Sequence, residues 1–405
     1  MDSRFWRWVV IHIDAPYVTR EIAETFFHAS RKNRIRIYIC YSGPPFMNPD
    51  RENRRVMMAM ECARPHLSRC SEFNLRILYR SSTVIASRYL DGTYAPSRGK
   101  LSLISSITDS TECFGAIKLI CPRLLWIWLD AQSLVDFIFT NTGHTSFPQS
   151  NIILHATRYR PHGIPNSLLA KSFAHAVAIA RRKVIVTFTL TDVEFSHNDH
   201  SEVISSISLN TRPQEEEDHG RELIIRLTDM EGPSISSLLN HIMADTLSSS
   251  LISIDNCDLA GFELHDRLPF QCRLSLDNIR STSSLTAITS QWDGSVLLLR
   301  SCAGFNRDFL YILGEDTNIC PNMKTLAIDG LHWSLGELIH MCEARHNAGR
   351  RLERLEVEGD IPVASGEELE LLEMYVDEVD WSPGYDLMQE HADMGRRGSS
   401  DEVQV

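Results

Sequence analysis

The chain lacks the sequence features of membrane proteins and secreted proteins. No apolar run reaches the roughly 18 residues that a membrane helix needs, and residues 173–180, the best candidate, are followed directly by three basic residues. The first residues contain no signal-peptide core, and there is no Asn-x-Ser/Thr glycosylation site. The ten cysteines include no Cys-x-x-Cys pair. We therefore expect a soluble protein of the cytoplasm or nucleus, not secreted, whose thiols pack as small hydrophobic side chains.

Catalytic motifs are also missing. Gly-x-Ser-x-Gly, His-Glu-x-x-His and Gly-x-Gly-x-x-Gly do not occur. The stretch from Gly92 to Lys100 resembles a phosphate loop, but six residues instead of four separate its glycines, and Leu101 follows the lysine. His197 and His200, with an aspartate between them, offer too few zinc ligands in a stretch typical of a loop. We assign no catalytic residue, no cofactor and no metal ligand.

Charge is distributed unevenly along the chain. The net charge is -13, yet residues 1–100 hold 17 basic and 9 acidic side chains, while residues 364–405 hold 12 acidic and 2 basic ones. The arginines of the first hundred residues alternate with apolar residues and form no basic blocks, so we expect no nucleic-acid partner. The acidic end loses apolar periodicity, which predicts a disordered tail at residues 377–405.

Short apolar segments recur along the chain, and a polar turn and a helical stretch usually follow each one. A length of 405 residues exceeds the roughly 250 to 300 at which one core stops growing, so several domains or an elongated array are expected. The predicted strand segments are residues 9–13, 35–39, 73–78, 124–129, 152–154, 184–190, 223–227, 251–254, 273–276, 296–299, 325–328 and 352–357.

The spacing of these segments favours a repeat protein. One apolar anchor per segment gives spacings of 22 to 39 residues, several of them within the roughly 20 to 29 of leucine-rich repeats. The anchors are Ile127, Ile153, Val186, Ile225, Ile252, Leu274, Leu297, Leu326 and Leu355. Cys257 and Cys302 fall at the Asn/Cys position of the pattern L-x-x-L-x-L-x-x-N/C, and Ile120-Cys121-Pro122 is repeated as Ile319-Cys320-Pro321. The alternative is an ordinary parallel α/β domain.

Helix caps complete the expected organisation. Ser334 and Glu337 form a capping box before a helix that ends near Gly349, and Asn48 precedes Pro49 at a second helix start. Residues 281–290 are polar and predict a surface loop. We expect strand-helix units over residues 1–110, a leucine-rich-repeat-like solenoid over 111–360, a terminal helix over 361–376 and the tail over 377–405. The predicted fold class is α/β, with a curved, mainly parallel sheet, helices on its convex side and irregular repeats.

The chain resembles a family of fungal, especially basidiomycete, F-box proteins with leucine-rich repeats. The opening FWRWVVIHID, the later RKNRIRIYIC and RPHLSRCSEFNLRI, and ICPNMKTLAIDG carry the likeness over about residues 4 to 360. The F-box itself would lie before Phe5, where only four residues stand, so no ligase-docking residue is transferred. The resemblance implies the substrate-recognition part alone, either from a paralogue that lost its F-box or from an incomplete gene model.

Two functions from different classes follow. The first is a non-catalytic protein-protein interaction protein, resembling the recognition part of a ubiquitin-ligase adaptor, which we expect to be a monomer that binds a protein on its concave face. Its candidate partner-binding residues are Arg273, Ser275, Arg300, Thr325, Asp329, Arg354, Glu356 and Glu358. The second is an α/β enzyme with dispersed acid-base residues, which would need a deep polar pocket with clustered carboxylates and histidines. Trp126 and Trp128 alternate with aliphatic residues, which favours packing on one face of the sheet over stacking on a ligand.

Overall fold

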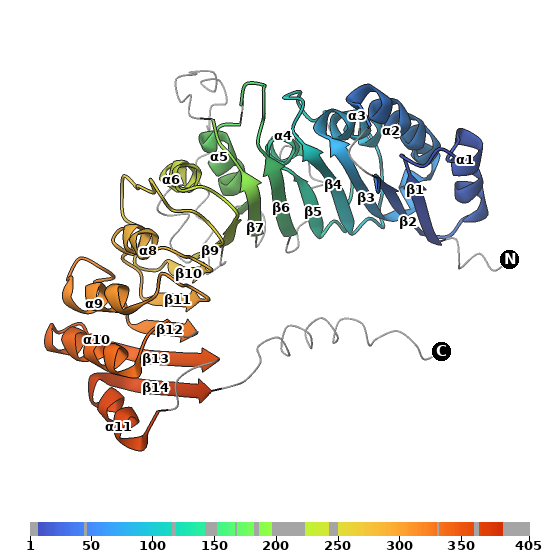
Figure 1. Cartoon of the computed structure of the whole chain (residues 1–405). Helices are drawn as coiled ribbons and strands as arrows, with labels where there is room; N and C mark the ends of the chain where they lie inside the picture. Colours follow the sequence, from blue (N-terminus) through green and yellow to red (C-terminus); the bar gives the residue numbers. More distant parts are fainter. Residues whose placement is uncertain are drawn as a thin grey trace, which may run out of the picture. The chain divides into compact units, whose positions relative to one another are not determined.

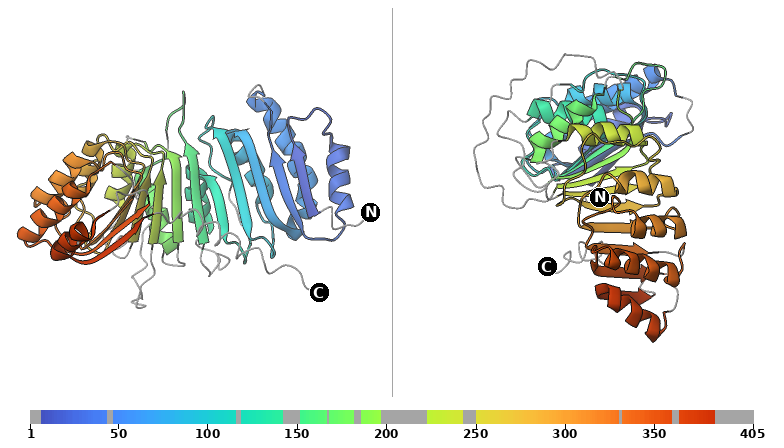
Figure 2. Two further views of the ribbon diagram at one scale, coloured as in Figure 1. Left: turned by 60° about the horizontal axis from the view of Figure 1, so that its bottom comes forward. Right: turned by 90° about the vertical axis from the view of Figure 1, so that its left-hand side faces the viewer.

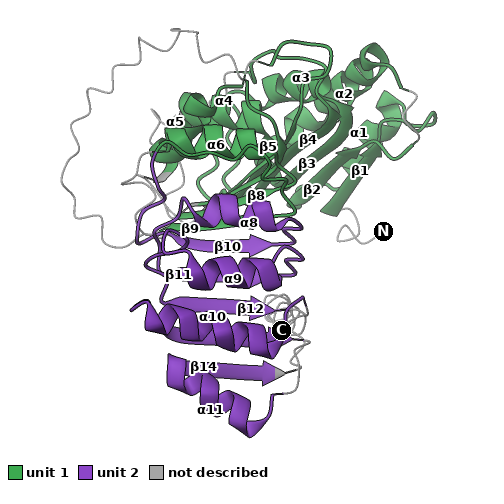
Figure 3. Ribbon diagram, turned by 60° about the vertical axis from the view of Figure 1, so that its left-hand side comes forward, with its two compact units in different colours: residues 1–265 green, residues 266–405 purple. Residues whose placement is uncertain are grey.

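The computed structural model describes residues 7–43, 47–115, 119–141, 152–166, 168–181, 186–196, 223–242, 250–329, 332–359 and 364–383. The chain divides into two compact units, residues 1–265 and 266–405 (Figure 3). In the described ranges there are fourteen strands, and every strand pair within each unit is parallel. The expected α/β class with a parallel sheet is confirmed.

Unit 1 alternates strands with helices, and its strands pair in the order of the chain (Figure 1). Its strands are β1 (Trp8–His12), β2 (Ile35–Cys40), β3 (Cys70–Tyr79), β4 (Lys100–Ile107), β5 (Trp126–Asp130), β6 (Ile152–Tyr159), β7 (Val186–Val193), β8 (Leu223–Thr228) and β9 (Ser250–Asp255). Its helices are α1 (Arg20–Ala29), α2 (Pro49–Ala63), the 3-10 helix η2 (Arg64–Arg69), α3 (Arg80–Leu90), α4 (Ala131–Asn141), α5 (Ala170–Arg181) and α6 (Gly232–His241).

Unit 2 repeats the arrangement with shorter connections. Its strands, again paired in chain order, are β10 (Arg273–Asp277), β11 (Val296–Arg300), β12 (Thr325–Asp329), β13 (Leu352–Gly359) and β14 (Val376–Pro383). Its helices are α8 (Thr282–Thr289), α9 (Arg307–Glu315), α10 (Leu335–Asn347) and α11 (Gly366–Tyr375). The helices of each unit lie on one side of its strands (Figure 2).

The core of each unit lies between the sheet and its helices. Alternate strand residues point into it and are almost fully shielded from water, as are Leu101, Ile127 and Leu154 in unit 1 and Leu297 and Leu326 in unit 2. Successive side chains of a strand point to opposite faces, so the intervening residues stand on the face opposite the described helices. We call this second face the open face.

The strand register corrects two of the sequence anchors. Ile127 pairs with Leu154 and not with Ile153, and Leu154 pairs with Phe188 and not with Val186. Ile153 lies on the open face, beside Trp126. A one-residue error in register moves a side chain to the other face, and both faces of β6 carry apolar residues, which hid the error.

The helix caps agree with the sequence, and one predicted loop was wrong. Both capping-box hydrogen bonds of Ser334 and Glu337 are present, and Asn48 caps α2, which starts at Pro49. Gly349, with φ +71°, follows α10 in the left-handed region that favours glycine. Residues 282–289, expected in a surface loop, form α8, because Leu285 and Ile288 are buried one turn apart.

The chain end also differs from expectation. The terminal helix predicted over residues 361–376 occupies 366–375, and residues 377–383 of the predicted disordered tail belong to β14. Residues 384–405 of that tail lie outside the described residues. Within the described ranges, no helix combines the length and apolar character that crossing a bilayer requires.

Candidate interaction surface

The open face of unit 2 carries all eight candidate partner-binding residues. They alternate with buried leucines, isoleucines and valines in four of its strands. Thr325 pairs with Arg354, and Asp329 pairs with Glu358, so these four residues lie in two rows across neighbouring strands. Arg273 and Ser275 stand two strands away on β10. The alternation of the sequence was therefore sufficient to find the face.

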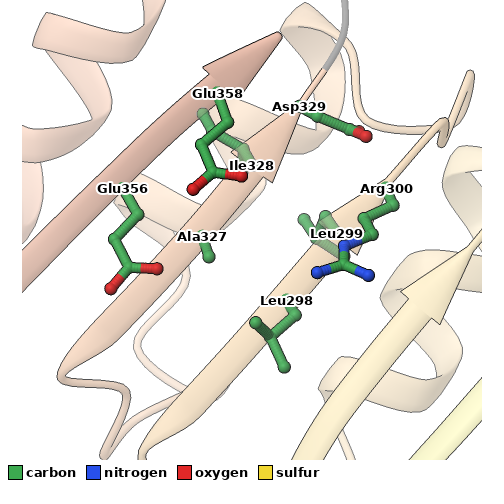
Figure 4. A pocket seen from close by; sticks show the side chains of 8 residues that line it. All are labelled: Leu298, Leu299, Arg300, Ala327, Ile328, Asp329, Glu356 and Glu358. Carbon is green, nitrogen blue, oxygen red and sulfur yellow. The ribbon is translucent and has the colours of Figure 1, made fainter. Parts of the chain in front are cut away.

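Four of the eight residues line a shallow hollow in unit 2. Its volume is about 70 Å³, and Arg300, Asp329, Glu356 and Glu358 contribute to its wall together with Leu298 and Ala327. Figure 4 shows the side chains of Glu356 and Glu358 on the same side of the sheet. This hollow is too small for a drug-sized molecule, which needs roughly 300 Å³ or more.

Ion pairs link the open face of β13 to β14. Arg354 lies 2.7 Å from Glu356, 3.9 Å from Asp380 and 4.0 Å from Glu378, measured between side-chain nitrogen and oxygen atoms. Glu378 and Asp380 were not among the sequence candidates, because the sequence placed them in the disordered tail. Their alternation with Val379 and Trp381 was the available signal.

A hydrogen bond of Asp329 links the end of β12 to the turn that follows β11. Its Oδ1 accepts a 2.6 Å hydrogen bond from the backbone N–H of Ser301 in the preceding turn. Burial raises the pKa of Asp329, and the Ser301 hydrogen bond opposes that rise. We call Asp329, Glu356, Glu358, Glu378 and Asp380 the acidic patch. Among the described residues, no group of three or more His, Cys, Asp or Glu side chains is placed to hold a metal ion.

Unit 1 has a different open face, which the sequence candidates did not include. The register places Trp8, Arg36, Glu72, Lys100 and Trp126 in one row across five strands. The Arg36 guanidinium lies 4.7 Å from the centre of the Trp8 ring, and Trp8 stacks on Tyr38 with ring centres 5.3 Å apart. Side chains of β1 to β3 alternate as those of β12 do, so the same signal was available there.

Glu72 connects the charges of this row. Its carboxylate lies 3.6 Å from Arg36 Nε and 3.3 Å from Lys100 Nζ, and it accepts a 3.0 Å hydrogen bond from Asn74. Burial alone would raise the pKa of Glu72, but hydrogen bonds from Asn74, Tyr38 and Lys100 outweigh it and lower the pKa. Burial, with the charge of Glu72, raises the pKa of Tyr38 to about 12, so its hydroxyl stays protonated.

Three aromatic rings form a cluster in the middle of the unit 1 face. Trp126 stacks on His155 at 6.0 Å between ring centres, and Trp128 lies 5.3 Å from the same imidazole. Trp126 is 45% exposed, so the tryptophans cover the open face, and one remains accessible to a ligand. Burial lowers the pKa of His155, and the nearby charges of Arg226 and Lys100 lower it further. The cluster is therefore neutral, with cations around it.

A repeated turn lies at the carboxyl end of six consecutive strands, β6 to β11, within the last two residues or directly after them. One residue of each turn has a positive φ: Arg158, Asp192, Asp229, Asn256, Asn278 and Ser301. The next residue is buried in every case: Tyr159, Val193, Met230, Cys257, Ile279 and Cys302. The sequence placed two cysteines at this position, and both are buried there.

The thiols of Cys257 and Cys302 donate to backbone carbonyls of the strand that each follows and of the strand before it. Cys257 Sγ–H faces Leu227 O at 3.5 Å and Asp255 O at 3.2 Å, and Cys302 Sγ–H faces Leu276 O at 3.4 Å. Burial raises the pKa of both thiols to about 11, so they remain protonated donors.

Comparisons of the chain with protein-family models, curated proteins and solved structures find no match.

Proposed function

We propose that this protein is a non-catalytic recognition protein built from irregular leucine-rich repeats, and that it binds a protein partner on the open face. The sequence resemblance extends the proposal to the substrate-recognition part of an F-box ubiquitin-ligase adaptor. The buried cysteines after β9 and β11, with their hydrogen bonds to neighbouring carbonyls, support the repeat type.

The observation that carries the proposal is a parallel sheet of which the described helices cover one face and leave the other uncovered. Parallel sheets are usually covered on both faces, because the crossover helices pack on either side, and their strands are then apolar on both sides. Here the second face of unit 1 exposes Trp8 at 52% and Trp126 at 45%, and that of unit 2 exposes a mixed set of charges. Exposed aromatic side chains among paired charges are typical of protein interfaces.

The enzyme alternative has less support. The larger hollow of unit 1, about 530 Å³, is lined by arginine, serine, threonine, isoleucine and aspartate side chains and has neither histidine nor cysteine in its wall. The candidate general base of such a site would have to be an aspartate, and both aspartates there are already engaged by an arginine or an asparagine. The proposal of a recognition protein is therefore preferred.

Comparative capture of partners tests the proposal. The tagged protein and its variants would be incubated with a lysate of the source cells, and captured proteins quantified by mass spectrometry. The test variant combines Trp126→Ala and Arg300→Glu, one open-face change in each unit. The matched control combines Tyr94→Ala and Arg307→Glu, two exposed positions outside the strands. We expect the test variant to lose the captured partner by about tenfold or more, since central aromatic and arginine residues dominate interfaces.

The control variant should capture the partner as the parent does. A partner retained equally by the test variant and the parent would contradict binding on the open face. Folding of each variant would be verified by circular dichroism before capture.

A further inference from the structure

The hollow of about 530 Å³ in unit 1 lies at the carboxyl ends of its strands. Its wall includes Arg76 from β3, Ser105 from β4, Arg158 from β6 and Asp192 from β7. In open parallel sheets, ligands bind beyond the carboxyl ends of the strands. A volume of this size falls within the roughly 300 to 1,000 Å³ of small-ligand sites. We call it the arginine hollow.

The arginines of the hollow differ in what they already bind. Arg160 is fully used: it lies against the Asp192 carboxylate, donates to Glu231 Oε1 at 3.1 Å, and donates to the carbonyl of Asp229 at 3.3 Å. Arg158 uses only its Nε, 3.2 Å from Asp192 Oδ2. Its two terminal nitrogens have no acceptor among the residues that the structure describes.

Arg76 is the least engaged cation of the hollow. Within the described ranges, its guanidinium has neither a hydrogen-bond acceptor nor an ion-pair partner. Matched residues of β3 and β6 lie three strand spacings apart, about 14 Å at roughly 4.8 Å per spacing, so Arg76 and Arg158 stand on either side of the hollow. A ligand between them would meet a guanidinium from each side.

Hydroxyl groups line the hollow between the two arginines. Thr157 Oγ1 is shielded from water and has no hydrogen-bond partner among the described residues. Ser106 of β4 also lines the hollow, and Thr191 stands beside Thr157 on the next strand. An unpartnered buried hydroxyl is costly, so a ligand oxygen that hydrogen-bonds it would be stabilised.

Both carboxylates of the hollow already have a side-chain partner. Asp192 faces both Arg158 and Arg160, and Asp229 Oδ1 accepts a 2.5 Å hydrogen bond from Asn256. The ion pair with Asp192 therefore holds the Arg158 side chain in place. The two terminal nitrogens of Arg158 remain available to other acceptors. The neutral amide of Asn256 leaves the charge of Asp229 in place. The described wall holds three arginines and two aspartates, so its formal net charge is +1.

We propose that the arginine hollow binds a phosphate monoester. Two guanidinium groups with free nitrogens and a set of hydroxyl donors match the charge and the acceptor oxygens of a phosphate group, because arginine forks pair with phosphate through parallel hydrogen bonds. The volume leaves room for the group that carries the phosphate. The site lies outside the residues chosen to test the proposed function, so each proposal can fail alone.

Titration calorimetry on the full chain tests this site. The probes are inorganic phosphate, a sugar phosphate, a phosphoserine peptide and the same peptide without its phosphate. The test variant combines Arg76→Gln and Arg158→Gln. The control variant combines Arg88→Gln and Arg123→Gln, which removes the same charge from two exposed positions outside the hollow. We expect the parent and the control to bind a phosphorylated probe. The test variant should bind it with an affinity that is lower by about tenfold or more.

The probes also identify the source of the phosphate. Binding of the sugar phosphate indicates a small metabolite, whereas binding of the phosphopeptide alone indicates a phosphorylated protein segment. If the parent binds no phosphorylated probe at millimolar concentration, or the test variant binds it as tightly as the parent, the proposal is overturned. If the double variant fails to fold, Arg76→Gln alone serves, since Arg76 holds no other described side chain in place.

Discussion

The ion pair between Arg80 and Asp130 is almost completely shielded from water. The two side chains are 0% and 2% exposed, and Arg80 Nε lies 3.1 Å from Asp130 Oδ1. Arg80 also donates to the carbonyls of Ser110 and Glu112, both at 2.8 Å. The Arg80 guanidinium thus holds the segment between β4 and β5 to the last residue of β5. Neutralising its partner leaves a buried charge without compensation.

We expect Asp130→Asn to reduce the free energy of unfolding by about 3 to 5 kcal/mol. The control is Arg88→Gln, which breaks the ion pair with Glu112, whose side chains are 60% and 66% exposed, and should cost less than about 1 kcal/mol. Urea denaturation of both variants measures the difference. Equal losses in the two variants would show that burial does not strengthen the Arg80 pair.

His66 should make stability depend on pH. Burial lowers its pKa to about 4, and Arg69, whose Nη2 lies 3.2 Å from His66 Nδ1, acts in the same direction. The unfolded chain binds the proton near pH 6.5, while the folded chain resists it down to about pH 4. The stability that His66 contributes is therefore complete above pH 6.5 and is lost progressively as the pH falls from 6.5 to 4.

The variant His66→Phe tests this dependence. The phenyl ring can keep the stacking on Phe27, whose centre lies 4.9 Å from the imidazole, but it cannot titrate. Melting temperatures measured between pH 4 and 7 should fall less steeply in the variant than in the parent. Parallel curves for the two proteins would mean that His66 is protonated equally in the folded and unfolded chains.

Cys302 offers a test of the repeat type. Its position in a leucine-rich repeat accepts either cysteine or asparagine, because both side chains donate to backbone carbonyls of the neighbouring repeat. We expect Cys302→Asn to change the free energy of unfolding by about 1 kcal/mol or less. Cys342→Asn, at a buried position inside α10, should cost about 2 kcal/mol or more. Thermal melts that rank the two variants in the opposite order would argue against the repeat assignment.

At the scale of elements, each strand contributes leucines to a core shared with its neighbours. Leu326 of β12 is 0% exposed and is paired with Leu297 of β11 and Leu355 of β13. We expect Leu326→Ala to cost about 2 to 5 kcal/mol and to loosen both adjacent strands. Thr325→Ala, on the open face of the same strand, is the control. Hydrogen exchange should show faster exchange across β11 to β13 in the first variant only.

The last strand should stabilise unit 2. β14 pairs with β13 from Val376 to Pro383, Val376 is fully buried, and Trp381 packs edge-on against Trp333 at 6.3 Å. A chain ending at Tyr375 should therefore melt about 5 °C or more below a chain ending at Pro383. The two truncations differ only in β14, so identical melting temperatures would show that this strand adds nothing to the unit.

At the scale of the molecule, the alternation of apolar and polar residues was enough to predict the parallel α/β class and twelve of the strands. It missed β4 and β14, because their sequences KLSLISSI and VDEVDWSP are unusually polar for buried strands. It also missed α8, whose serines and threonines hide the pair Leu285 and Ile288. Local polarity outweighed periodicity in all three cases.

The candidate residues of unit 2 were found because one face of each strand is strictly apolar. The arginine hollow could not be found in the same way. Arg76 and Arg158 are 82 positions apart in the sequence, and only the pairing of β3 to β6 brings them to one hollow. Such a site depends on register, which a one-residue error is enough to misplace.

The pairing of strands in chain order has a consequence for biosynthesis. Within each unit, every strand after the first pairs with the strand translated just before it. A ribosome adding about 5 to 20 residues per second releases a new strand every few seconds, while a local pairing step takes microseconds to milliseconds. Each strand can therefore dock as it emerges without waiting for downstream sequence, and it becomes the edge on which the next strand pairs.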